Sequence, residues 1–220
     1  MRSLALLAIF AALLAAGCGL PSPYFLEPPG YPKLGFASDS TPIFYVESTT
    51  VNNEPEFRGF ELYYKCYKDE ASIEDGFGPG NQESDLKAAG FLPVCTASDL
   101  SPQGRSVPLI PIDVDDRGST FTITLNFNAP GTAQYKYNGP VSLENVSVGV
   151  RRFVFDGVNR CKTFDYASFL APDADISKIY AELSGGPIYI AMYALSYGKQ
   201  DLATTIWSTP VYLGWAKIIP

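Results

Sequence analysis

The sequence predicts an all-β fold, an antiparallel sandwich of about seven to nine strands that carries an inserted segment. In residues 119–128, Phe121, Ile123, Leu125 and Phe127 fall on one face and polar residues fall on the other. Strict alternation of this kind is typical of a half-buried antiparallel strand. Asn-Gly-Pro, Asp-Gly and Gly-Gly turn signals separate similar segments, and segments with helical spacing are few. Many short strands joined by turns favour a sandwich.

Residues 57–67 alternate almost as regularly, with Phe60, Leu62, Tyr64 and Cys66 on one face. The other strand candidates are apolar or alternating segments bounded by turn residues. They are residues 42–47, 107–114, 146–155, 188–197 and 206–218. With residues 57–67 and 119–128 they give about seven strands.

Two short helices are predicted between these strands. Residues 82–89 fit two turns, with Asn81 as the cap and Gly90 as the stop. Residues 173–183 carry apolar side chains at helical spacing and form the second candidate.

Residues 1–17 have the pattern of a signal peptide. Arg2 supplies the charged start, and residues 4–16 form an unbroken apolar run. This run is shorter than the roughly 20 residues that a membrane-spanning helix needs. Small residues then lead into a cysteine, in the order Leu-Ala-Ala-Gly-Cys, which ends at Cys18.

This segment resembles the lipobox of bacterial lipoproteins, whose cysteine receives a lipid such as palmitate after the preceding peptide is removed. The resemblance implies that the chain is attached to a membrane of the bacterial cell envelope through Cys18. Gly19, rather than Asp, follows the cysteine, which favours the outer membrane or cell surface over the inner membrane. Ala15 stands where such motifs most often have Leu. The alternative is an ordinary secretory signal whose Cys18 joins a disulfide.

Residues 18–35 are predicted to form the lipidated cysteine and a proline-rich spacer. Residues 19–35 contain prolines at five positions without periodicity, which favours an extended, semi-stiff tether. In the alternative, Tyr24, Phe25 and Leu26 pack onto the domain as an irregular first strand. The sandwich domain is expected to cover residues 36–220.

The motif FRGFELYYKCY, residues 57–67, looks like the third strand of a fibronectin type III domain. Residues 188–198, followed by residues 207–218, look like the closing hairpin of the same fold, and residues 146–164 also resemble a closing pair. The resemblance implies a fibronectin type III-like or immunoglobulin-like sandwich, although the usual Trp of the second strand is missing. Lipobox, proline spacer and tyrosine-rich sandwich together resemble uncharacterised lipoproteins of spirochaete-type bacteria.

Residues 68–106 form the inserted segment, which mixes charged residues with a glycine cluster. Long loops in compact domains are often functional, so a binding surface is one interpretation. In the other, the segment is a solvated decoration held by its own apolar cluster of Leu86, Phe91, Leu92 and Val94.

Without Cys18, three cysteines remain, and in an exported protein two of them are expected to pair. Loop-closure entropy does not distinguish the three pairings. We expect Cys66 to bond to Cys95, because this disulfide would clamp the inserted segment at its base. Cys161 would then be a buried thiol. If Cys18 is not acylated, two disulfides could form.

The chain contains no histidine, which excludes histidine-based nucleophilic catalysis and most catalytic zinc sites. Its net charge of −7 argues against nucleic acid as a partner. The acidic residues 113–116 and 173–175 lack the spacing of a calcium-binding loop. The sequence therefore predicts no metal and no cofactor.

Four tyrosines lie on the polar side of their predicted strands: Tyr63, Tyr67, Tyr189 and Tyr193. Tyrosine is enriched at protein interfaces, so these are candidate interaction residues. The alternative is that they cover the second sheet face or pair across strands.

These features predict a membrane-anchored, non-catalytic binding or structural module with a protein or envelope partner. A small-ligand or glycan-binding lipoprotein is the alternative. A carboxylate-based hydrolase is a third interpretation, which would require two facing carboxylates in a cleft.

Overall fold

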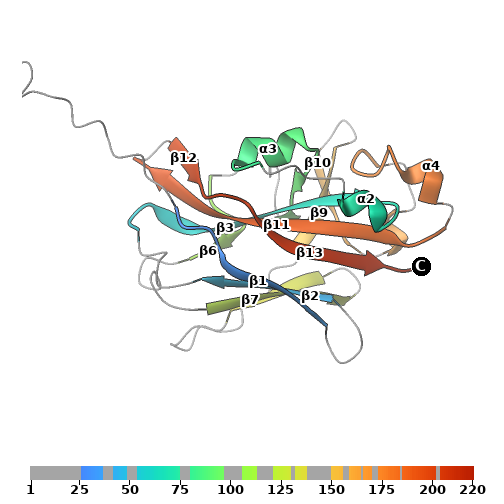
Figure 1. The fold of residues 1–220 in the computed structure, drawn as a ribbon, viewed down its shortest axis with the longest axis horizontal. Coiled ribbons are helices and arrows are strands. Elements are labelled where there is room, and N and C mark those ends of the chain that lie inside the picture. Colours follow the sequence, from blue (N-terminus) through green and yellow to red (C-terminus); the bar gives the residue numbers. More distant parts are fainter. Residues whose placement is uncertain are drawn as a thin grey trace, which may run out of the picture.

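The computed structural model describes thirteen stretches of the chain, which begin at Leu26. They are residues 26–36, 42–48, 54–74, 80–96, 106–112, 121–129, 132–137, 150–155, 159–164, 166–169, 173–183, 185–201 and 204–220. Strands make up 47% of these residues and helices 16%, and the strands form antiparallel sheets (Figure 1). The predicted all-β sandwich is confirmed.

The first sheet has the strand order β1-β2-β7-β8-β9-β10, and β5 also pairs with β9. Its strands are β1 (Gly30–Phe36), β2 (Pro42–Ser48), β5 (Cys95–Thr96), β7 (Phe121–Ala129), β8 (Thr132–Tyr137), β9 (Val150–Phe155) and β10 (Asn159–Lys162).

The second sheet has the order β12-β11-β3-β4, with β13 along β11 and β6 along β3. Its strands are β3 (Phe57–Tyr67), β4 (Leu92–Pro93), β6 (Ile110–Pro111), β11 (Ile188–Gln200), β12 (Thr204–Trp207) and β13 (Val211–Ile218). In Figure 1, α2 (Ala71–Glu74) and α3 (Glu83–Ala88) lie on the side of this sheet that faces away from β1, β2 and β7.

Side-chain alternation on β3 and β11 gives the second sheet two buried faces. The inner face contributes Leu62, Tyr64 and Met192 to a large core that also contains Phe153 of the first sheet. The outer face forms a smaller cluster under α3, which contains Leu86 of that helix. A central strand that is covered on both sides removes apolar surface from water on both faces, and β3 and β11 contribute half of the buried residues of the two clusters.

Most predicted strands are confirmed. Residues 57–67 are β3, and residues 42–47 and 119–128 correspond to β2 and β7. Residues 188–197 begin β11, which continues to Gln200, and the predicted 146–164 hairpin contains β9 and β10.

The predicted strand at 206–218 is divided into β12 and β13. Ser208 lies at the division, where its N–H donates to Ser196 O at 3.0 Å and its Oγ accepts from Ser196 N–H at 2.8 Å. These bonds keep both strands against the same edge of β11. Of residues 107–114, only Ile110–Pro111 pairs as a strand among the residues described there. The short strand β8 was not predicted.

The folded body begins earlier than the predicted boundary at residue 36. Gly30–Phe36 forms β1, which pairs with β2, and Leu26 is buried in the main core. Pro32 is tolerated because β1 is the edge strand of its sheet, where an N–H is not required for pairing. Residues 30–35 of the predicted spacer are therefore part of the first sheet, and Leu26 packs onto the domain as the alternative interpretation expected. Residues 1–25, which include Cys18, Tyr24 and Phe25, lie outside the described residues.

The predicted helix at 82–89 is α3, and its cap is Gln82 rather than Asn81. The Asp85 carboxylate accepts the Asn81 and Gln82 N–H groups at 2.9 and 3.0 Å. Gly90 has a φ of +87°, a left-handed conformation that glycine adopts without strain and that ends the helix.

The candidate at residues 173–183 is mostly a series of turns and becomes helical only at α4 (Tyr180–Leu183). None of the helices formed by described residues is long and apolar enough to span a bilayer.

The interpretation that the inserted segment has an apolar cluster of its own is wrong. Its apolar side chains are divided between the two cores. Leu86 and Phe91 belong to the outer cluster, whereas Val94 belongs to the main core and Leu92 packs against it. The reason is that the segment turns around the edge of the second sheet, where β4 pairs with β3.

The predicted Cys66–Cys95 disulfide is wrong: Cys95 bonds to Cys161, and Cys66 is a buried free thiol. The β3–β4 register pairs Tyr64 with Leu92, which places Cys66 and Cys95 five positions apart along the ladder. Five positions correspond to about 16 Å, well beyond the roughly 7 Å that a disulfide spans between Cα atoms. Cys95 and Cys161 instead lie opposite residues of β9 that are two apart, and their Cα atoms are 6.1 Å from each other.

Cys161→Ser should lower the free energy of unfolding by about 2–4 kcal/mol, because the disulfide closes a long loop. The bond joins residues separated by 66 positions. Denaturant unfolding measures the loss, and non-reducing peptide mapping should recover the Cys95 and Cys161 peptides linked. Cys66→Ala is the control, since it leaves the linked peptide intact. Recovery of Cys66 in a disulfide with Cys95 would contradict the assignment.

Candidate functional site

A charged cluster is buried between the first sheet and the turns before α4. Arg152 of β9 is completely buried, and its Nη1 donates to Asp175 Oδ1 and Oδ2 at 2.8 and 3.0 Å. Its Nη2 donates to Asp173 Oδ2 and to Ser168 O. The guanidinium also lies 4.1 Å from the ring centroid of Phe169.

This cluster is stable only as a unit. A buried charge costs several kcal/mol unless a partner and further hydrogen bonds compensate it. Arg152 has two carboxylates, and Asp173 is also paired with Lys162. The arrangement ties β9 and β10 to the segment that starts at Asp173.

The ionisation of both carboxyls is governed by competition between burial and the guanidinium. Burial disfavours the Asp173 carboxylate, but hydrogen bonds from Lys162 and Arg152 outweigh this effect and lower its pKa. For Asp175, burial outweighs the charge of Arg152 and raises the pKa of the carboxyl. Burial opposes the charge of Arg152 as well, yet the two carboxylates together raise the pKa of the guanidinium.

Tyr64 and Cys66 of β3 lie on the inner side of this cluster. The Tyr64 hydroxyl is 2.9 Å from both Asp175 Oδ2 and Phe153 O. Burial raises the pKa of the Cys66 thiol well above its ordinary value, and the Asp175 charge adds to the effect. A thiol with a raised pKa is a weak nucleophile at neutral pH.

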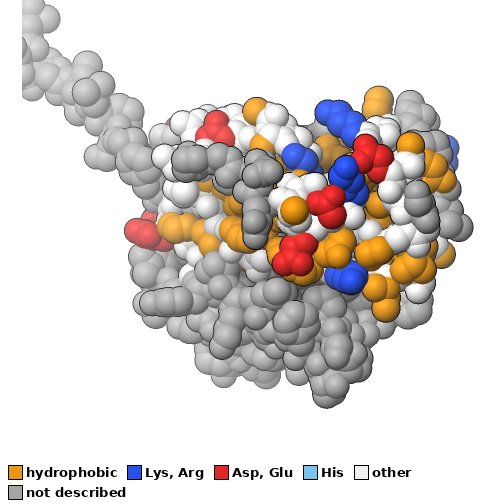
Figure 2. Space-filling view, turned by 45° about the vertical axis from the view of Figure 1, so that its right-hand side comes forward, with side chains coloured by type: hydrophobic (Ala, Val, Ile, Leu, Met, Phe, Trp, Pro, Cys, Tyr) orange, Lys and Arg blue, Asp and Glu red, His pale blue; other side chains and the backbone are white. Residues whose placement is uncertain are grey.

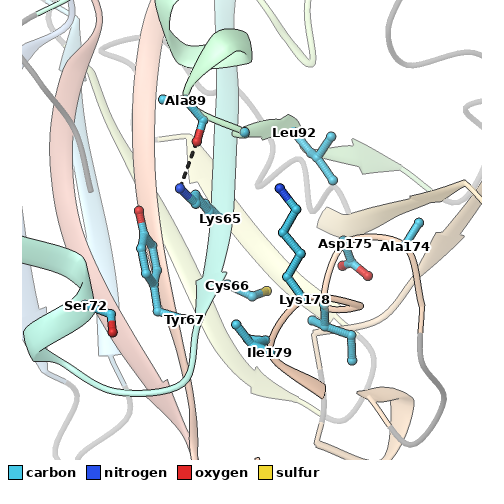
Figure 3. Close-up of a pocket in the computed structure, with 12 residues that line it drawn as sticks. Lys65, Cys66, Tyr67, Ser72, Ala89, Leu92, Ala174, Asp175, Lys178 and Ile179 are labelled. Atoms are coloured by element: carbon cyan, nitrogen blue, oxygen red, sulfur yellow. Dashed lines mark hydrogen bonds between the residues drawn. The ribbon is translucent and has the colours of Figure 1, made fainter. Parts of the chain in front are cut away.

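Next to the cluster lies an open pocket of about 420 Å³. It is bounded by the end of β3, the residues that follow α3 and the turns before α4 (Figure 3). Its lining combines ammonium, hydroxyl and apolar groups: Lys65, Cys66, Tyr67, Ser72, Ala89, Gly90, Leu92, Ala174, Asp175, Ile176, Lys178 and Ile179. Pockets of 300–1,000 Å³ with apolar walls and a few polar groups are typical of small-molecule sites.

Charged and apolar side chains are mixed on the surface around this end of the molecule. Figure 2 shows Lys and Arg side chains gathered among apolar and acidic ones in its right-hand part. No group of three or more His, Cys, Asp or Glu side chains within the described part of the chain is arranged to hold a metal ion.

The four tyrosines selected from the sequence share the outer face of the second sheet. Tyr63 pairs with Tyr193 and Tyr67 with Tyr189 across β3 and β11. Tyr63, Tyr67 and Tyr193 are buried, and Tyr189 packs beside them. Cross-strand pairing therefore describes their packing, and Tyr67 also lines the pocket.

Sequence reasoning missed Arg152, Lys65 and Lys178. Arg152 stands inside a largely apolar strand, which is a signal for a buried charge that needs a partner. Asp173 and Asp175 were considered only as metal ligands, and the structure places both against the guanidinium of Arg152.

Arg152→Met should lower the free energy of unfolding by about 3–5 kcal/mol, because both carboxylates would stay buried without their cation. Denaturant unfolding checks this value. The exposed Arg160 of the neighbouring strand gives the matched control, Arg160→Met, with a change within about 0.5 kcal/mol. Equal midpoints for the two variants would show that the cluster does not hold the fold together.

The outer tyrosines predict loss of stability in alkali. Burial, followed by the charges of Tyr212 and Cys66, raises the pKa of Tyr67 from 10.0 to about 12. A hydroxyl that ionises more readily in the unfolded chain favours unfolding, so its contribution is full below about pH 10 and is lost as the pH rises towards 12.

Urea unfolding measured from about pH 10 to 12 should therefore show a smaller decrease in the free energy of unfolding for Tyr67→Phe than for the unmodified chain. Tyr166→Phe, outside the outer cluster, is the control. A Tyr67→Phe chain that loses stability as steeply as the unmodified chain would show that this hydroxyl titrates normally.

Comparison of the chain with protein-family models, with curated proteins and with solved structures finds no match. The function is therefore inferred from the sequence pattern and from the pocket with its adjoining charged cluster.

Proposed function

We propose that this protein is a lipid-anchored protein of the bacterial cell envelope whose β-sandwich is a non-catalytic binding module. The observation that carries the proposal is the order of its parts. A signal-like apolar segment ends at Cys18, a short proline-containing stretch follows, and Leu26 is already packed in the core.

The distance from Cys18 to Leu26 limits where the sandwich sits. Eight residue steps span at most about 29 Å when fully extended. A lipid on Cys18 would hold the body close to the membrane surface, and two or more acyl chains anchor a protein stably. The outer membrane or the cell surface is the proposed site, because Gly19 follows the cysteine.

The arrangement of strands supports a fibronectin type III-like or immunoglobulin-like type within the sandwich class. In immunoglobulin-like sandwiches the third strand lies beside the last two in one sheet, and the first two lie with the fifth in the other. Here β3 is next to β11, which is next to β13, and β1, β2 and β7 are neighbours in the opposite sheet. Such folds serve many functions, so this correspondence supports the module type alone.

A protein or envelope partner is the first candidate for what the module binds. The pocket beside β3 specifically favours a second candidate, a small ligand. Hydrolysis by two carboxylates receives less support, because Asp173 and Asp175 are both bound to Arg152 instead of facing each other across the pocket.

Cys18→Ser should release the protein from the membrane fraction of the cells that produce it, because the acylated thiol is lost. Fractionation followed by immunoblotting measures the distribution, and incorporation of a palmitate analogue should disappear in the same variant. Cys66→Ser is the matched control and should remain in the membrane fraction. Full membrane retention of the Cys18→Ser chain would refute the anchor.

A further inference from the structure

Two lysine side chains enter the pocket from different walls. Lys65 belongs to β3, and Lys178 belongs to the turns before α4. Figure 3 shows the Lys65 ammonium group pointing to Ala89 O and the Lys178 side chain extending beside Leu92, and both lysines line the same pocket. Consistent with this, burial and then the charge of Lys178 lower the pKa of Lys65. The pocket therefore brings two positive charges together.

No carboxylate among the described residues pairs with either ammonium group. Lys65 Nζ donates to Ala89 O at 2.8 Å and lies 5.1 Å from the ring centroid of Tyr67. The salt bridges of the described lysines belong instead to other residues, Lys68, Lys87 and Lys162. An ammonium group has three N–H donors, so Lys65 retains donors for a ligand.

The acidic side chain in the pocket wall does not neutralise these charges. Asp175 accepts hydrogen bonds from Arg152 at 2.8 and 3.0 Å, and the Tyr64 hydroxyl is 2.9 Å from its Oδ2. Its charge is thereby compensated by the guanidinium of Arg152. The pocket remains electropositive beside apolar walls formed by Leu92 and Ile176.

We infer that this pocket binds a small organic monocarboxylate with an apolar body. The two oxygens of one carboxylate can each accept from one lysine, while the body displaces water from the apolar walls. No arginine is among the residues that line the pocket, so the bidentate guanidinium contacts typical of phosphate recognition are not offered there. Tyr67 and Ser72 add hydroxyl groups at the rim.

The pocket lies at the end of β11 opposite the place where the described chain begins. Leu26, where the described chain begins, lies against Gly198 at one end of β11. Cys66 and Tyr67 of the pocket pair with Ile190 and Tyr189 at the other end. The eight positions from Ile190 to Gly198 correspond to about 27 Å. This inference rests on the proposed binding role of the sandwich and not on the lipid anchor.

Fluorine NMR of para-fluorophenylacetate with the full chain in detergent tests the inference. We expect saturable binding to the unmodified protein and about tenfold weaker binding to Lys65→Met and to Lys178→Met, which is about 1.4 kcal/mol. Lys87→Met, on α3 outside the pocket, removes the same charge and should bind as the unmodified protein does. Partition of the fluorinated probe into detergent micelles is the same for all variants, so differences between variants report binding to the protein. Circular dichroism checks the fold, and the exposed Lys178 keeps the test valid if Lys65→Met does not fold.

Two further probes separate the contribution of the carboxylate to binding from that of the apolar body and from that of a phosphate group. The uncharged para-fluorophenylethanol should bind much more weakly, and equal binding would show that the pocket selects only apolar bodies. Tighter binding of para-fluorophenyl phosphate would overturn the ligand class. Absence of saturable carboxylate binding, or equal binding to all lysine variants, would overturn the site. Each result is independent of Cys18 fractionation, so failure of the pocket and failure of the anchor are distinguishable.

Discussion

The buried guanidinium of Arg152 holds several irregular segments of this molecule against the first sheet. Arg152 has no solvent-exposed surface, and its hydrogen bonds reach Asp173, Asp175 and the backbone of Ser168. Because an isolated buried charge is so unfavourable, these segments have to pack against β9 for the sheet to form. One cation thus fixes irregular turns that have few strand or helix bonds of their own.

The ion pair between Arg152 and Asp175 also shapes the neighbouring pocket. Arg152 and the Tyr64 hydroxyl bond the oxygens of Asp175, so the charge of this pocket-lining carboxylate is compensated by the guanidinium. The pocket walls come from β3, from the end of α3 and from the turns that Arg152 holds. The electropositive site therefore depends on a structural ion pair. The site lies at the end of β11 opposite Leu26.

Local periodicity explains why the central strands were predictable. Alternation in residues 57–67 assigned Tyr64 and Cys66 to one face and Tyr63 and Tyr67 to the other, and both assignments agree with the two cores. The two-residue strands β4, β5 and β6 are too short to have a period. Likewise, most of β1 was interpreted as part of a spacer because the five prolines of residues 19–35 suggest an extended tether. Only the position of β1 at a sheet edge makes Pro32 compatible with a strand.

The sequence by itself determined the all-β class, the two faces of β3 and the lack of imidazole chemistry, because these depend on neighbouring residues or on composition alone. Tertiary structure decided which of the described cysteines pair and which carboxylates bind Arg152. Cys95 and Cys161 are separated by 66 positions, and Tyr64 and Asp175 by 111. Disulfides and ion pairs form only when such distant residues approach within a few ångströms, and this approach is set by strand register and sheet order. The pocket belongs to the same category, since its two lysines come from opposite halves of the chain.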